Sequence, residues 1–204
     1  SAASGSNTIT LTSLSDATYS NCTIIVTDSE GNVSNTLAIT SFSVDATTPY
    51  LISILPIDNQ TSVSETDNIS ITFSEVMDNN SITTNSSGTG CTGTFQVSSD
   101  NFSTCVQMSS SPSVPNSDNL TFSVNPSSRL SYSTTYKIKV TTGVEDYNGN
   151  NMSSDNLTAN GFTIKNWTKQ FGSSSNEEGL GVAVDSSDNI YVTGFTEGAL
   201  DNNT

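Results

Sequence analysis

The sequence reads ISITF at residues 69–73 and YKIKV at residues 136–140. In both stretches apolar side chains alternate with polar ones. Because successive side chains of a β-strand point to opposite faces of a sheet, each stretch predicts a strand with one buried face and one wet face. Residues that favour turns, chiefly Asn, Asp and Gly, follow both stretches. The two stretches therefore predict an all-β fold.

Residues 50–164 contain further short runs of this kind at fairly even spacing, which is typical of a β-sandwich. We expect strands at Tyr50–Leu55, Ile69–Phe73, Thr92–Val97, Cys105–Met108, Leu120–Val124, Tyr136–Thr142 and Gly161–Ile164. This region is the main predicted domain.

The segments on either side predict parts of other modules. Residues 1–44 predict strands at Thr8–Leu14, Thr18–Thr27 and Thr36–Val44, which are too few to bury a core of their own. Residues 45–49 end in Pro49 and predict an extended linker. Residues 165–204 predict a hairpin of Gly179–Asp185 and Ile190–Thr196. Because both ends fall within modules, we expect a segment of a longer repeat protein.

Composition supports the all-β prediction and narrows the function. Ser, Thr and Asn account for 91 of the 204 residues, and these side chains favour turns and wet strand faces over helices. The net charge of −15 would repel phosphate groups, so we expect neither nucleic acid nor anionic membrane as a partner. No apolar run is long enough to cross a bilayer. The carboxylate excess suits divalent cations, and it equally serves solubility.

The sequence offers no recognisable catalytic site. It contains no His and no G-x-S-x-G motif, so no serine has an evident base to activate it. With 20 Asp and Glu residues, pairs of acids arise from composition alone. We therefore expect a non-enzymatic protein.

Two acidic turns are candidate calcium sites, because calcium binds several carboxylate, amide and backbone oxygens. The first combines Asp28, Glu30 and Asn32, with Asp45 at the linker as a further ligand that would let one ion bridge two modules. The second contains Asp146, Asn148 and Asn150. The competing interpretation is that both segments only form tight turns, in which Asp and Asn bond to their own backbone.

The three cysteines suggest an oxidising compartment. Cys91 and Cys105 flank a predicted hairpin and are candidates for a disulfide, the alternative being two buried thiols. Without His or a C-x-x-C pair, a structural zinc site is excluded. Cys22 then remains, either to pair outside this segment or to act as a small buried apolar residue.

Three stretches resemble known bacterial families. DSEGN at 28–32 and VDATTP at 44–49 resemble the end of one bacterial immunoglobulin-like module and its junction with the next. ITFSEVMDNNSI at 71–82 and TTYKIKVTTGVEDYNGN at 134–150 resemble the SbsA-like bacterial immunoglobulin-like domain. WTKQFG at 167–172 and GVAVDSSDNIYVTGFTEG at 181–198 resemble an SBBP-type β-propeller repeat. The resemblances imply tandem immunoglobulin-like β-sandwiches followed by a partial propeller blade, in which Trp167, Phe171, Tyr191 and Phe195 would form blade core rather than a ligand-stacking platform.

This organisation predicts a structural or adhesive segment of a large extracellular or bacterial cell-surface protein, in the form of a spacer or a filament component. Its expected partners are neighbouring modules, or identical subunits joined by strand addition, and surface glycans or proteins are further candidates. The alternative is an accessory spacer or carbohydrate-binding region of a secreted polysaccharide-degrading enzyme.

Overall fold

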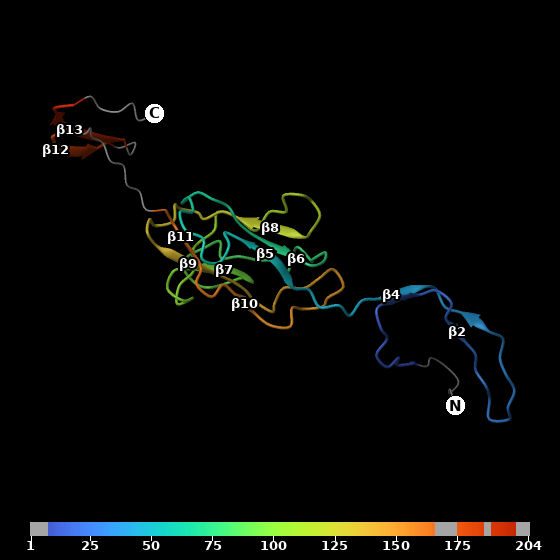
Figure 1. The fold of residues 1–204 in the computed structure, drawn as a ribbon. Helices are drawn as coiled ribbons and strands as arrows, with labels where there is room; N and C mark the ends of the chain where they lie inside the picture. Colours follow the sequence, from blue (N-terminus) through green and yellow to red (C-terminus); the bar gives the residue numbers. More distant parts are fainter. Residues whose placement is uncertain (1–7, 166–174, 186–188, 199–204) are drawn as a thin grey trace. The chain divides into compact units, whose positions relative to one another are not determined.

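The computed structural model describes residues 8–165, 175–185 and 189–198, and Figure 1 shows the path of the chain. All thirteen elements among these residues are β-strands, so the predicted all-β class is confirmed. The contacts divide the chain into two units, residues 1–165 and 166–204. The described part of the chain contains no helix that could span a bilayer.

Two antiparallel sheets form the sandwich of the main domain (Figure 1). One contains β5 (Leu51–Leu55), β6 (Ile69–Phe73) and β8 (Thr121–Val124), with β6 in the middle. In the other, β9 (Thr135–Val140) pairs with β7 (Phe95–Ser98) and with two short strands, β10 (Asn156–Leu157) and β11 (Phe162–Thr163).

The two stretches with clear alternation provide much of the core. In β6 the apolar residues at positions 69, 71 and 73 are buried, and in β9 those at 136, 138 and 140 are buried. Phe73 meets Phe122 edge-on at 5.9 Å between ring centroids, and Tyr136 stacks on Phe162 at the same distance. Such aromatic pairs add to the free energy gained by burying apolar area.

Residues 8–44 form two small antiparallel pairs. β1 (Ala17–Tyr19) pairs with β4 (Phe42–Val44), and β2 (Thr23–Ile24) pairs with β3 (Leu37–Ala38). The Tyr19 ring stacks on the Phe42 ring at 5.3 Å. None of residues 8–44 is buried, which agrees with the expectation that this segment cannot bury a core of its own.

Four strand predictions were wrong in detail. Thr36–Val44 is divided into β3 and β4, which pair with different strands. Thr8–Leu14 forms no strand and is mostly exposed, because it has no partner for its backbone groups. Thr18–Thr27 is divided into β1 and β2, since each half pairs with a different strand. Cys105–Met108 forms only an isolated bridge between Met108 and Pro126, and Pro has no N–H with which to extend a ladder.

The second unit contains a hairpin of β12 (Glu177–Val184) and β13 (Ile190–Thr196), with a bulge at Leu180. A Cβ at Gly194 would lie 2.3 Å from the Glu178 carbonyl oxygen, so only glycine fits this position. Trp167 and Phe171, which we expected in the core of a blade, lie outside the described residues. Tyr191 and Phe195 are 57% and 50% exposed.

Candidate metal centre

Three turns of the chain are closed by the same arrangement of hydrogen bonds. An Asp carboxylate accepts the backbone N–H of the Asn four residues later through one oxygen, and its Nδ2–H through the other. The pairs, with these two distances, are Asp28–Asn32 (2.8 and 2.9 Å), Asp146–Asn150 (2.8 and 2.8 Å) and Asp185–Asn189 (2.9 and 2.8 Å). Each Asp backbone N–H also donates to the carbonyl of its Asn. We call this arrangement the Asp–Asn clamp.

In the first candidate site, the clamp occupies the carboxylate that we expected to bind calcium. The Asn32 side chain and backbone hold the pKa of Asp28 below its usual value, with further donation from the Glu30 N–H. All three residues are exposed. Among the described residues, neither Asp28 nor Glu30 belongs to a cluster of potential metal ligands. Calcium binding at this loop stays a prediction, and the geometry is that of a closed turn.

The second candidate site is built differently, because the Asp of its clamp is buried. Asp146 is 1% exposed. Burial alone would raise the pKa of this carboxyl, but donation by the side chain and backbone of Asn150 and by the N–H of Asn148 lowers it below its usual value. Asp146 is therefore held as a carboxylate inside the domain.

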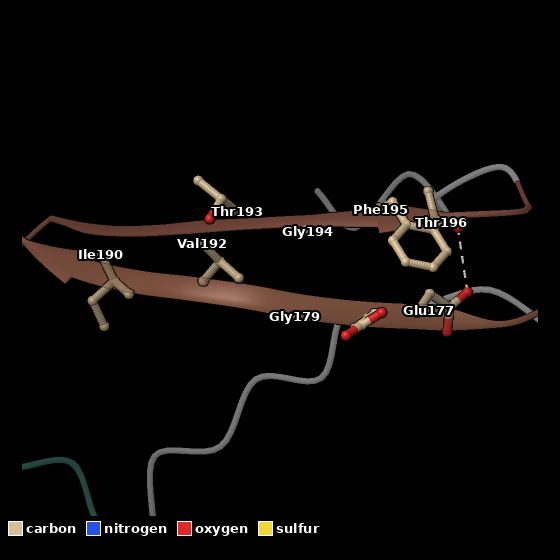
Figure 2. A pocket seen from close by; sticks show the side chains of 9 residues that line it. Glu177, Gly179, Ile190, Val192, Thr193, Gly194, Phe195 and Thr196 are labelled. Carbon is tan, nitrogen blue, oxygen red and sulfur yellow. Dashed lines mark hydrogen bonds between the residues drawn. The ribbon is translucent and has the colours of Figure 1, made fainter.

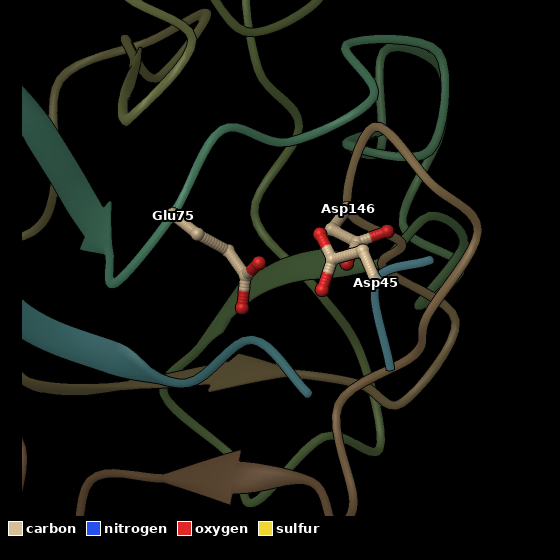
Figure 3. Close-up of side chains that lie close together, drawn as sticks. All are labelled: Asp45, Glu75 and Asp146. Atoms are coloured by element: carbon tan, nitrogen blue, oxygen red, sulfur yellow. The ribbon is translucent and has the colours of Figure 1, made fainter. Parts of the chain in front are cut away.

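Two further carboxylates converge on Asp146, as Figure 3 shows. Asp45, from the linker, and Glu75, two residues after the end of β6, each place a carboxylate oxygen within 4.8 Å of the others. Asn148 Nδ2 donates to Asp45 Oδ2 at 2.6 Å, and Asn150 Nδ2 donates to the Asp45 carbonyl at 3.2 Å. The structure thus brings Asp45 to the second loop, whereas the sequence grouped it with the first. We call Asp45, Glu75 and Asp146 the joint cluster.

The electrostatics of the joint cluster favour a cation or a proton. Burial, followed by the charges of Asp146, Asp45 and Asp16, raises the pKa of Glu75. In the described structure Glu75 Oε1 is buried without a hydrogen-bond partner. Three carboxylates with a nearby backbone carbonyl supply the hard oxygen ligands that calcium prefers. A calcium ion here would neutralise the repulsion and use the unsatisfied oxygen.

Sequence reasoning missed Glu75 as a ligand. It lies in the FSEVMD string that carried the family resemblance, yet 71 residues separate it from Asp146. Asp16, also missed, ties residues 8–44 to the linker by accepting the Ala46 N–H at 2.6 Å and the Thr47 hydroxyl at 2.5 Å. No local pattern signalled either contact, because both depend on how distant segments pack.

The cysteines are placed as follows. Cys91 and Cys105 form a disulfide with their Cα atoms 4.9 Å apart, and it closes the loop that contains Asp100. Cys22 is free and partly exposed.

The hairpin of the second unit has a hollow of about 390 Å³, seen in Figure 2. Its lining includes Ile190, Val192, Phe195 and the backbone of Gly179 and Gly194. Glu177 Oε1 accepts the Thr196 hydroxyl at 3.4 Å along its rim. The lining mixes apolar side chains with Glu and Thr, and the hollow is formed by one hairpin whose side chains are largely exposed.

Each of the two units matches the model of a known protein family. A model of the bacterial Ig-like domain matches residues 45–164, which is more than half of the chain. The chain belongs to the bacterial Ig-like domain family. A model of a β-propeller repeat matches residues 166–200. The resemblances to the bacterial Ig-like domain and to the β-propeller repeat are thus confirmed, and neither matching family is a catalytic one. Neither match includes residues 28–32, so their resemblance to the end of a preceding module stays a prediction.

Solved structures similar to this bacterial Ig-like chain are distant. Domains 1–6 of the surface layer protein SbsC share 17% identity over 72% of this chain and 19% of that one, with a TM-score of 0.41. The N-terminal part of SbsC gives the same identity and TM-score over 33% of its length. The alpha-2-macroglobulin of E. coli shares 13% identity over 63% of this chain and 7% of its own, with a TM-score of 0.39. The chain thus spans a third or less of each. No curated protein sequence matches it significantly.

Proposed function

We propose that this chain is a structural and adhesive segment of an extracellular or cell-surface bacterial protein, in which calcium at the joint cluster holds the Ig-like domain to the preceding module. The observation that carries the proposal is the convergence of Asp45, Glu75 and Asp146 within 4.8 Å. Asp45 belongs to the linker, whereas the other two belong to the domain, so one ion would contact both.

The contacts around the linker support a joint of limited flexibility. Asp16, which belongs to residues 8–44, accepts two hydrogen bonds from linker residues 46 and 47. Asn148 and Asn150 donate to Asp45 on the side of the domain. Residues 45–47 of the linker are therefore tied both to residues 8–44 and to the domain, and a bound ion would add a further constraint. A stiff joint between modules lets a chain of them extend away from a surface.

The disulfide and the acidity fit an extracellular location. Disulfides persist in oxidising compartments, and extracellular calcium modules bind their ion with a Kd of about 0.1 to 1 mM. A site with three carboxylates suits that range because it has charge but few rigid ligands. The rival function, a spacer in a secreted polysaccharide-degrading enzyme, shares these properties and differs only in the domains joined to it.

A second proposed role is strand addition between subunits. It is favoured by the apolar side chains that residues 8–44 expose. Leu37 is 63% exposed, Val33 66% and Ile25 54%, although they lie in or beside paired strands. A strand donated by a neighbouring module or a second copy would cover them and complete the sandwich.

Calorimetric titration of the calcium-free full chain with calcium tests the proposed joint. We expect one site in the millimolar range or tighter, lost in Asp45→Ala and retained in Asp28→Ala, which removes the carboxylate of the other loop. Small-angle scattering should then show a narrower distribution of chain extensions with calcium than without it. Equal heats for Asp45→Ala and the parent chain would overturn the proposal.

A further inference from the structure

Two Asn-Gly dipeptides occur in the chain, Asn148–Gly149 and Asn160–Gly161. Because glycine has no side chain to block the approach, its backbone nitrogen can attack the side-chain carbonyl carbon of the preceding Asn. A new N–Cγ bond forms, the Cγ–Nδ2 bond breaks, and ammonia leaves with the amide proton. Water then opens the resulting succinimide ring to aspartate or isoaspartate.

The structure protects the attacking glycine nitrogen of one dipeptide better than that of the other. The Gly161 N–H donates to Asp58 Oδ1 at 2.6 Å, and Gly161 is buried with its Cα against the Tyr136 carbonyl. The Gly149 N–H has only a long bond of 3.3 Å to the Asp146 carbonyl. Gly149 is exposed, and no atom beyond its own residue and its two chain neighbours lies within 4 Å of the position a Cβ would take.

We infer that Asn148 is a deamidation site, and that its conversion irreversibly loosens the joint between the two modules. Asn148 Nδ2 is the donor in the 2.6 Å hydrogen bond to Asp45 Oδ2. Deamidation replaces this donor with a carboxylate, so the bond is lost. The product also places a further negative charge beside Asp45, which already belongs to the joint cluster. The inference does not depend on calcium binding.

The contact with Asp45 also controls the reaction. While Asn148 Nδ2 donates to Asp45, the Asn148 side chain cannot rotate freely. Ring closure requires such a rotation, because it must bring Cγ of Asn148 close to the Gly149 nitrogen. Opening of the joint releases the side chain. The amount of deamidated Asn148 should therefore increase with the time that the joint spends open.

Peptide mapping by mass spectrometry tests the site. The full chain is incubated in mildly alkaline buffer with a chelator, and deamidated product is counted at each Asn. We expect Asn148 to convert about tenfold faster than Asn160, because the charged acceptor of the Gly161 N–H strengthens its protection. Asp45→Ala should accelerate the reaction at Asn148 and leave that at Asn160 unchanged. Equal rates at the two asparagines, or no effect of Asp45→Ala, would refute the inference.

The consequence for the joint is tested with a product mimic. Asn148→Asp is compared with Asn79→Asp, which adds the same charge on an exposed turn outside the joint cluster. Amide hydrogen exchange is measured at Ala46 and Thr47, whose N–H groups donate to Asp16 and Asp45. We expect protection to fall about tenfold in Asn148→Asp, the loss of one charge-assisted bond, and to stay unchanged in the control. Unchanged protection in Asn148→Asp would contradict the loosening.

Discussion

Replacing Glu75 with Gln should stabilise the domain when calcium is absent and weaken its response when calcium is added. The substitution keeps the size of the side chain and removes its charge. Glu75 has a raised pKa because it is buried and faces Asp146, Asp45 and Asp16. A carboxylate whose pKa is raised on folding opposes folding when it is charged. Without a cation, the neutral amide should therefore be tolerated better than the carboxylate.

The size of the effect follows from the separation of the carboxylates. At 4.8 Å, two like charges repel by about 1 kcal/mol in water and about 3.5 kcal/mol at an effective dielectric constant of about 20. Asp45 and Glu75 are only partly buried, so the lower part of this range applies. We expect Glu75→Gln to raise the free energy of unfolding by about 1 to 2 kcal/mol in chelator near neutral pH.

Calcium should narrow the difference in stability between the two proteins. With a Kd of about 0.1 to 1 mM and about 10 mM calcium, binding stabilises the parent chain by about 1.4 to 2.7 kcal/mol. The variant lacks one of three charged ligands and should gain less. Urea unfolding of both full chains, with chelator and with calcium, measures all four free energies. Glu145→Gln is the matched control, since it removes a neighbouring carboxylate that lies outside the joint cluster.

The pH dependence of the stability difference between Glu75→Gln and the parent chain independently checks the repulsion at Glu75. As pH falls through the raised pKa of Glu75, the parent carboxyl takes up a proton and the repulsion is relieved. The advantage of Glu75→Gln in chelator should therefore shrink in acid and be largest at neutral pH. If the variant is destabilised in chelator, or if both proteins respond equally to calcium, the carboxylates do not interact as described.

Three further outcomes follow from the structure. The hydroxyl and N–H of Thr104 and the hydroxyl of Ser98 lower the pKa of Asp100 to about 2, so its contribution to stability should be complete above the unfolded value of 3.8 and be lost as pH falls towards about 2. Acid unfolding of Asp100→Asn against the parent chain measures this. Replacing both cysteines of the Cys91–Cys105 disulfide with Ala should lower the free energy of unfolding by about 3 kcal/mol, as expected for a loop of about 15 residues, and adding reductant to the parent chain should have the same effect. Phe73→Ala should cost about 3 to 5 kcal/mol in urea unfolding, because Phe73 is 1% exposed and packs on Phe122.

Alternation of apolar and polar residues correctly predicted two central strands of the main domain, β6 and β9. In β6 and β9 the alternation of apolar and polar residues matches the alternation of buried and partly buried positions. Some strands without such alternation were also found, since Ile190–Thr196 forms β13 with the predicted bounds, but short strands were missed. Asn156–Leu157 forms β10 because it lies along β9 and not because of its own residues. Thr8–Leu14 has suitable residues and no partner. Pairing is a property of distant segments, so local patterns cannot determine it.

The candidate site illustrates the same limit at the level of single carboxylates. DSEGN at 28–32 and DYNGN at 146–150 look alike, and both form the same Asp–Asn clamp. The clamp uses the Asp as a turn-forming acceptor, so the loop sequence alone does not make a metal site. Of the two loops, only the second has a buried Asp, and beside it Asp45 and Glu75 add their oxygens. Because a hard cation needs several oxygens in one place, what distinguishes the two loops is the packing around them rather than the residues within them.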